Sequence, residues 1–260
     1  MPYSTLKLQI FSDIATITLS RPEKRNAIST EMINDLMGAL AEIETSSARV
    51  AILTGEGKAF CSGIDLAALK AIATQSPEEN LEDARRFARL LRRIWSFPKP
   101  TIAVVNGAAI AGGCGIATLC DFTLAIPEAT FGYPEVRIGF LPANVAVFLM
   151  RQIDEKHARD LLLTGRIIDA AEAQRMGLVT QIAPATELMS AAQKLAATLV
   201  ESSPTSLLKT KKLLCDIAAA EIDRELELAI AESAQIRSTA DFREGLASFL
   251  EKRPPKWVGK

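Results

Sequence analysis

The chain has 260 residues, of which 48% are hydrophobic, and its 30 basic and 31 acidic residues give a formal net charge of −1. This hydrophobic content excludes wholesale disorder, and the balanced charge gives no general electrostatic attraction to nucleic acids or membranes. The single histidine, His157, excludes most zinc sites and catalytic triads that depend on histidine.

The first half of the chain alternates short apolar runs with helical stretches. Residues 14–19 (IATITL) are rich in β-branched residues and predict a strand, with which residues 6–10 are expected to pair. The other expected elements are helices at 30–44, 81–95 and 113–119, and strands at 50–54, 101–105 and 122–126. This strand-strand-helix order predicts stacked turns of β-structure with helices outside.

After Pro142 the predicted strands almost vanish. Helical spacing covers residues 155–163, 170–176, 188–201, 207–219, 222–237 and 242–250. The sequence therefore predicts an α/β core in residues 1–200 and a helical region in residues 201–260. Such a helical region is expected to cover the active site or to pack against another subunit.

The cysteines and the N-terminus indicate the compartment. Cys61, Cys114, Cys120 and Cys215 form no C-x-x-C pair and suggest no disulfide framework, which fits reduced thiols in a cytosol. The N-terminal residues MPYSTLKLQI contain no signal-peptide stretch, and no run of about 18 apolar residues predicts a membrane span. We therefore expect a soluble cytoplasmic protein.

A glycine-rich stretch, NGAAIAGGCGI, covers residues 106–116, where a strand is expected to run directly into a helix. A phosphate-binding P-loop needs lysine where Gly113 stands, and a dinucleotide-binding fingerprint needs glycine where Thr118 stands, so both are excluded. Two interpretations stay open. The glycines allow close packing of the helix on the sheet, or they let a ligand oxygen reach the N–H groups at the helix start.

Two further stretches carry candidate chemistry. Residues 58–66 (KAFCSGIDL) follow the strand at 50–54 and also enter a helix after small residues. If the N–H groups at the start of the helix at 113–119 form one half of an oxyanion hole, this stretch is expected to form the other half. Residues 130–142 (TFGYPEVRIGFLP) place Glu135 among apolar residues, where a raised pKa suits a general acid and base near neutral pH. The alternative is a surface glutamate paired with Arg137.

Together these stretches resemble the crotonase, or enoyl-CoA hydratase/isomerase, superfamily over nearly the whole chain. The matching segments are RPEKRNAI, KAFCSGIDL, KPTIAVVNGAAIAGGCGIATLCDF, FGYPEVRIGFLP, LLLTGRIIDAAEAQRMGLV and DFREGLASFLEKRPPKW. The resemblance implies a crotonase-like α/β spiral of strand-strand-helix turns with a C-terminal helical trimerisation region. It also implies a homotrimer or hexamer, and an acyl-CoA thioester substrate processed through an enolate with no cofactor beyond the substrate's own CoA.

The resemblance also implies roles for individual residues. By position, the oxyanion donors are the Ser62 and Gly112 N–H groups, and Glu135 is the acid and base. The residues expected near the CoA moiety are Lys24, Arg25, Ala27, Ser62, Asp65 and Leu66. The acyl pocket is expected to be shaped by Tyr133, Arg137, Asn144, Phe148 and the helix at 81–95. For Lys24 and Arg25 a solvated charge run is the alternative, and for Arg137 a structural salt bridge is the favoured role.

The chain departs from the family's two-glutamate hydratases at one position. Gly115 stands where those enzymes carry their first glutamate, and residues 143–146 (ANVA) replace the usual glycine-rich stretch after the proline. We expect an enoyl-CoA hydratase in which Glu135 acts with help from the backbone, Asn144 or a second water. The alternative is a Δ3-Δ2-enoyl-CoA isomerase with Glu135 as sole proton shuttle. An RNA-binding or non-catalytic homologue is disfavoured by the charge balance and by the presence of Glu135 and both oxyanion loops.

Overall fold

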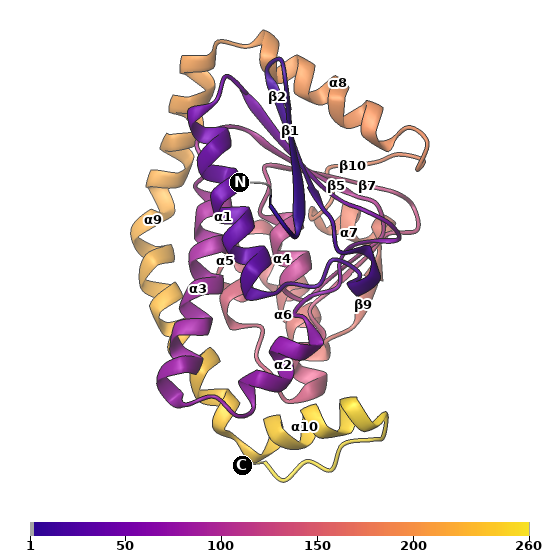
Figure 1. The fold of residues 1–260 in the computed structure, drawn as a ribbon, viewed down its shortest axis with the longest axis vertical. Coiled ribbons are helices and arrows are strands. Elements are labelled where there is room, and N and C mark those ends of the chain that lie inside the picture. The colour runs from indigo at the N-terminus through magenta and orange to yellow at the C-terminus, as the bar shows by residue number, and fades with distance from the viewer. Residues whose placement is uncertain (1–2, 260) are drawn as a thin grey trace.

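The computed structural model describes residues 3–259 and contains two β-sheets (Figure 1). The six-stranded sheet has the order β1-β2-β3-β5-β7-β10, in which β1 is antiparallel to β2 and the other neighbours are parallel. Its strands are β1 (Leu6–Phe11), β2 (Ile14–Leu19), β3 (Val50–Gly55), β5 (Thr101–Val105), β7 (Phe122–Ala125) and β10 (Gln181–Ile182). The predicted pairing of β1 with β2 is confirmed.

The second sheet has four short strands in the order β4-β6-β8-β9. They are β4 (Ala59–Cys61), β6 (Ala108–Ile110), β8 (Thr130–Gly132) and β9 (Ile167–Asp169). Three successive turns of chain each place one strand in each sheet, which confirms the predicted strand-strand-helix order. The expectation that a strand runs directly into a helix at residues 106–116 is wrong, because β6 intervenes between β5 and α4. Strands this short show no periodicity in a sequence.

The helices of the core are α1 (Thr30–Thr45), α2 (Leu66–Ile72), α3 (Pro77–Trp95), α4 (Gly112–Thr118), α5 (Ala143–Gln152), α6 (Glu155–Thr164) and α7 (Ala170–Met176), with 3₁₀ helices η1 (Pro22–Lys24) and η2 (Pro134–Ile138). Helix α3 begins four residues before its predicted start because Ser76 and Glu79 form a reciprocal capping box. Helix α5 was not predicted, since its buried residues run almost continuously and hide the helical period.

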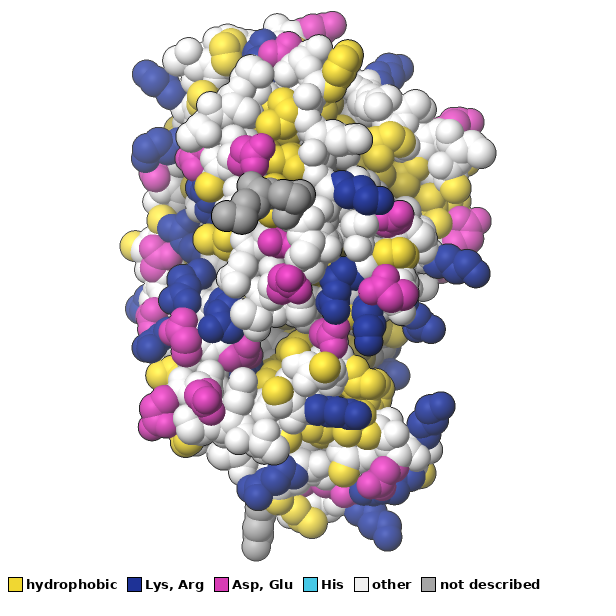
Figure 2. Space-filling model, viewed as in Figure 1, with side chains coloured by type: hydrophobic (Ala, Val, Ile, Leu, Met, Phe, Trp, Pro, Cys, Tyr) yellow, Lys and Arg dark blue, Asp and Glu magenta, His cyan; other side chains and the backbone are white. Residues whose placement is uncertain are grey.

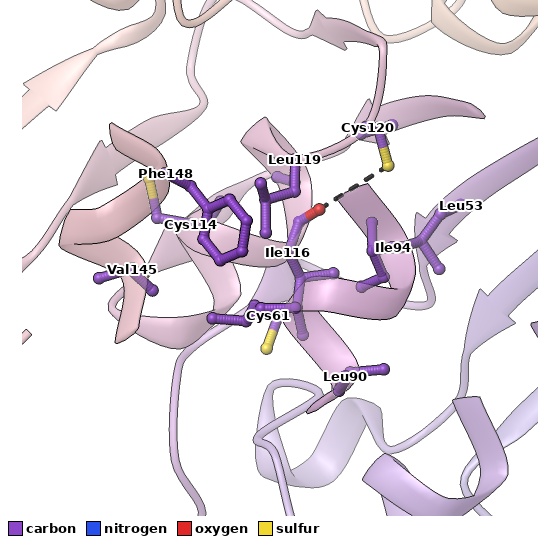
Figure 3. Close-up of a cluster of buried hydrophobic side chains, with 14 of the residues drawn as sticks. Leu53, Cys61, Leu90, Ile94, Cys114, Ile116, Leu119, Cys120, Val145 and Phe148 are labelled. Carbon is purple, nitrogen blue, oxygen red and sulfur yellow. Dashed lines mark hydrogen bonds between the residues drawn. The ribbon is translucent and has the colours of Figure 1, made fainter. Parts of the chain in front are cut away.

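Both faces of the six-stranded sheet are covered, as expected for parallel strands. On one face Val50, Ile52, Ile102, Val104 and Leu124 pack against helix α8 (Leu188–Glu201). The alternate residues, such as Leu53, Ala103 and Val105, face the main core. Helix α4 lies inside this core with all its residues buried, next to Cys61, Val145 and Phe148 (Figure 3).

The C-terminal region consists of α9 (Pro204–Gln235), the 3₁₀ helix η3 (Ile236–Ser238) and α10 (Ala240–Glu251). The two helices predicted at 207–219 and 222–237 are one helix, because no glycine or proline separates them. Figure 1 shows α9 along one side of the molecule, where it packs on α3 and α5, and α10 at one end. Helix α10 packs against η2, so the C-terminal region reaches the segment that carries Glu135.

The surface is mixed in charge. On the face drawn in Figure 2, acidic and basic side chains are interspersed, in keeping with the net charge of −1. Within residues 3–259, no helix combines the length and apolar character that crossing a bilayer requires.

Candidate active site

The two loops singled out in the sequence meet in space. Strands β4 and β6 pair in parallel, so the segment after Cys61 lies beside the junction of β6 and α4. A Cβ atom placed on Gly63 would lie 3.0 Å from the Ala111 Cβ. The backbone N–H groups of both loops therefore lie close enough together to act on one ligand.

The first candidate donor is the Gly112 N–H, at the first residue of α4. It has no hydrogen-bond partner in residues 3–259. The preceding residue, Ala111, has φ +54° and ψ −128°, a conformation that costs a non-glycine residue on the order of 1–3 kcal/mol. This strained residue sets the direction of the first N–H groups of the helix.

The second candidate donor differs from the sequence-based assignment. The Ser62 N–H already donates to the Arg25 carbonyl at 3.1 Å, so it is not free. Ile64 forms a parallel bridge with Ile28, whose N–H donates to the Gly63 carbonyl and whose carbonyl accepts from Asp65. Because peptide groups alternate in direction along an extended strand, the Ile64 N–H points away from Ile28 and toward the β6 side. Within the described residues this N–H has no partner.

The glycines of α4 allow close packing. A Cβ on Gly113 would lie 2.4 Å from the Cys61 carbonyl oxygen, so only glycine lets α4 approach β4 this closely. A Cβ on Gly112 would meet the Phe87 Cζ at 2.7 Å and the Ile28 Cδ1 at 3.1 Å. Gly113 therefore supports the close-packing interpretation, and at Gly112 the side chains of Phe87 and Ile28 leave no room for a Cβ.

Glu135 is buried in the 3₁₀ helix η2, with only 9% of its surface exposed. Its Oε2 has no hydrogen-bond partner in residues 3–259, and Arg137 instead donates to the Thr164 carbonyl. Burial raises the pKa of Glu135 from 4.5 to about 7, because the ionised carboxylate loses its hydration. An unpaired carboxyl that titrates near neutral pH is suited to moving protons.

Helix α10 holds the segment around Glu135 in place. Gly139 ends η2 with φ +66°, and a Cβ there would lie 2.4 Å from the Asp241 carbonyl oxygen. A Cβ on Gly245 would lie 2.2 Å from the Ile138 carbonyl oxygen. The two backbones therefore touch at two glycines, and the Phe140 N–H closes the turn on the Glu135 carbonyl at 3.0 Å.

The structure leaves no room for a carboxylate at Gly115, the position of the first glutamate in the two-glutamate hydratases. A Cβ on Gly115 would lie 2.6 Å from the Val145 Cγ1 and 3.8 Å from the Leu91 Cδ2. Figure 3 shows Val145 among the apolar side chains of this cluster. The space that a second glutamate would need is therefore occupied by the valine that replaces the usual glycine-rich sequence.

Three predicted pocket residues have different environments. Asn144 is 6% exposed; its Nδ2 donates to the Ala84 carbonyl at 3.1 Å, while its Oδ1 has no partner in the described chain. Tyr133 is packed in the core with its hydroxyl 3.4 Å from the Thr118 Oγ1. Arg137 is exposed and donates to the Thr164 carbonyl at 3.3 Å, so its contact is a hydrogen bond and not the expected salt bridge.

Some of the residues expected near CoA are exposed, and others are buried and make hydrogen bonds within the protein. Lys24, Arg25 and Leu66 are exposed, whereas Ala27 is buried and accepts a hydrogen bond from Arg21 at its carbonyl. The Asp65 carboxylate caps α2 at the Ala67 N–H and pairs with Arg21 at 2.8 Å, which lowers its pKa despite burial. Arg21 thus holds both Asp65 and the Ala27 carbonyl in place, a role that the sequence analysis missed. In the sequence Arg21 only begins the segment RPEKRNAI, and nothing near it indicates that Asp65 is its partner.

The comparisons with known proteins define the class. The family model described as enoyl-CoA hydratase/isomerase matches residues 9–260, and the chain belongs to this family. It is therefore an enzyme of the crotonase superfamily, as the sequence indicated. Within residues 3–259, no cluster of three or more histidine, cysteine, aspartate or glutamate side chains is arranged to hold a metal ion.

Individual relatives are similar over their whole length. A Thermus thermophilus protein named "Putative enoyl-CoA hydratase" is 43% identical over 94% of this chain and 97% of its own. The short-chain-enoyl-CoA hydratase of Clostridium acetobutylicum is 32% identical over 97% of both chains. A crystal structure of an enoyl-CoA hydratase from Mycobacterium avium, 32% identical, superposes with a TM-score of 0.87 over 98% of this chain and 99% of that one. The expected crotonase-like fold is confirmed.

Proposed function

We propose that this protein adds water to the double bond of a 2-enoyl-CoA ester, with Glu135 as acid and base. The observation that carries the proposal is the buried Glu135 carboxyl, with an unpaired Oε2 and a pKa of about 7, in an enzyme of this family. Near neutral pH such a group exists in both forms, so it can accept a proton and return it within one catalytic cycle.

In this proposal the thioester oxygen accepts hydrogen bonds from the Gly112 and Ile64 N–H groups. Attack at the β-carbon moves negative charge onto this oxygen, and donors fixed in the backbone stabilise that charge more than they stabilise the neutral thioester. One such donor is typically worth about 3–4 kcal/mol in the transition state. Ile64 replaces Ser62 as the proposed donor because the Ser62 N–H is bonded to Arg25.

The attacking water is proposed to lie between the Glu135 Oε2 and the Asn144 Oδ1. Both atoms are buried acceptors without a partner in residues 3–259, and a water molecule has one O–H for each. The Glu135 carboxylate removes one proton as the water oxygen bonds to the β-carbon. The enolate then takes a proton at the α-carbon from the Glu135 carboxyl, which restores the carboxylate and completes the addition of one water.

A second candidate is double-bond isomerisation, which the surroundings of Gly115 favour. The apolar Val145 and Leu91 fill the space beside that glycine, so no second carboxylate assists there. Isomerisation needs only one base, because Glu135 would remove a proton from the α-carbon and return it at the γ-carbon. The same oxyanion donors would stabilise the intermediate dienolate.

The two reactions are distinguished by supplying 2-enoyl- and 3-enoyl-CoA esters in water labelled with heavy oxygen. We expect the unmodified protein to form hydroxyacyl-CoA that carries the label. Fast double-bond migration with no labelled hydroxyl product would assign the isomerase reaction instead. Glu135→Gln should abolish both reactions and keep acyl-CoA binding, and full activity of that variant would exclude both mechanisms.

We further propose that the exposed Lys24 and Arg25 face the CoA phosphates, that the reaction uses no cofactor besides the substrate's CoA, and that the protein forms a homotrimer or hexamer. Helix α9 exposes an apolar set whose side chains are 60% to 73% accessible: Leu213, Leu214, Ile217 and Leu228. Such a set suits contact between protomers in a closed ring. Sedimentation should give three or six chains, and a stable, active monomer would contradict the assembly.

A further inference from the structure

A buried arginine lies at the end of α9. Arg237, in η3, is 6% exposed, and its Nη1 donates to the Asp83 Oδ2 at 2.9 Å and to the Asn80 Oδ1 at 3.2 Å. Its Nε is buried and has no acceptor in residues 3–259. Because a buried donor without an acceptor is costly, such a group normally meets a ligand or an ordered water.

Arg237 contacts helix α3, which also contacts the candidate active site. One face of α3 presents Asn80, Ala84, Phe87 and Leu91, which are spaced as neighbours on a helix surface. Arg237 binds the Asn80 carbonyl at 3.3 Å, and Asn144 binds the Ala84 carbonyl one turn further along.

The opposite end of the same face reaches the oxyanion region. Phe87 lies against Gly112, and Leu91 faces the position of Gly115. From Phe87 back to Asn80 is about 10 Å along the helix axis, at about 1.5 Å per residue. An acyl chain that extends from Gly112 along this face of α3 would reach Arg237 after about this length.

A second contact ties Arg237 to the segment that carries the acid and base. Its guanidinium stacks on the Phe140 ring with the Cζ 5.4 Å from the ring centroid. The Phe140 N–H in turn donates to the Glu135 carbonyl. Arg237 is therefore enclosed by α3 on one side and by the turn after η2 on another, and its Nε is a buried donor without an acceptor in residues 3–259.

The charge around Arg237 decides what kind of atom it can bind. Asp83 already neutralises the guanidinium, and Arg86, 3.8 Å from the other Asp83 oxygen, is partly exposed and screened by solvent. A carboxylate buried here would lose its hydration and lie near the Asp83 carboxylate, which already pairs with Arg237. A neutral oxygen accepts the Nε–H bond without that penalty.

We propose that Arg237 determines substrate specificity by donating a hydrogen bond to a neutral oxygen, hydroxyl or carbonyl, on the distal part of the acyl group. This inference rests on the proposed acyl-CoA site and adds the substrate class: an enoyl-CoA whose acyl chain carries an oxygen beyond the reacting carbons. Arg237 does not touch the reacting atoms, so it acts on substrate choice and not on the chemical step.

The test measures binding, which is independent of the reaction. Saturated acyl-CoA esters of increasing chain length are titrated calorimetrically as plain, ω-hydroxy and ω-carboxy forms. At the matching length, the unmodified protein should bind the ω-hydroxy ester at least about tenfold more tightly than the plain ester, since hydrogen bonds to charged groups are worth more than neutral ones. Arg237→Met should abolish that preference and leave the affinity for the plain ester within about twofold.

Two further variants separate recognition from a structural role. Arg92→Met removes an ion pair with Asp223 between the same helices, α3 and α9, and should keep the hydroxyl preference. Asp83→Asn leaves Arg237 with an uncompensated charge and should raise the affinity for the ω-carboxy ester at least about tenfold. This second variant decides the matter if Arg237→Met does not fold.

The proposal is overturned if the unmodified protein shows no hydroxyl preference at any chain length, or binds the ω-carboxy ester most tightly. It is also overturned if Arg237→Met keeps the preference, or if Asp83→Asn gains nothing for the carboxylate. Hydration of a plain 2-enoyl-CoA by the unmodified protein is measured separately. If the unmodified protein does not hydrate the plain ester, the proposed reaction is refuted. If it hydrates the ester but shows no binding preference, only the proposed role of Arg237 is refuted.

Discussion

Replacing Glu135 with glutamine should stabilise the folded protein above neutral pH, although it removes the proposed acid and base. In the folded protein the pKa of Glu135 is raised from 4.5 to about 7. Between these values the folded protein holds a proton that the unfolded chain has released, so the free energy of unfolding falls as the pH rises through this window. At about 1.36 kcal/mol per pKa unit, the loss amounts to about 3 kcal/mol once the pH exceeds 7.

Glutamine does not titrate in this range, so the free energy of unfolding of the variant should not fall for this reason. We expect the difference in unfolding free energy between Glu135→Gln and the unmodified protein to grow by about 3 kcal/mol from pH 4.5 to pH 7 and then to stay constant. Denaturant unfolding at fixed protein concentration across this range measures the difference. The exposed Glu128, changed to glutamine, controls for the loss of one negative charge. A difference that stays flat or shrinks with rising pH would refute a Glu135 carboxyl destabilised by burial.

The remaining predictions concern the glycines of α4. Gly112→Ala and Gly112→Pro both place a Cβ near Phe87, but only proline removes the N–H. The kcat should therefore be about a hundredfold lower for the proline variant than for the alanine variant. Equal kcat values in the two folded variants would exclude the Gly112 N–H as a donor. Gly115→Glu should lower the unfolding free energy by about 1–3 kcal/mol, because its Cβ meets Val145, and adding Val145→Gly should restore part of that loss. In the folded double variant we expect faster water addition, and a hydration rate unchanged from the unmodified protein would show that a second carboxylate does not assist.

Local sequence chemistry determined much of this protein. Most helices and the longer strands follow from apolar spacing and from glycine and proline at their ends, which are properties of neighbouring residues. The apolar residues around Glu135 left two interpretations open, a carboxyl with a raised pKa or a surface glutamate paired with Arg137, and the structure supports the first. The crotonase-like fold and the enzyme family were also predicted from the order of the motifs, and the comparisons confirm them.

Only the tertiary structure decided which groups are free to act. The Ser62 and Ile64 amides lie two residues apart in the same motif, and their difference arises from hydrogen bonds with the distant segment 25–28. The space beside Gly115 is filled by Val145 from another helix, a contact that the sequence did not predict. Arg237 gave no signal in the sequence, because its burial and its unpaired Nε depend on α3 and on the turn at Phe140. Spacing along a chain describes neighbours within a few residues, whereas the pairing of polar groups depends on segments that only folding brings together.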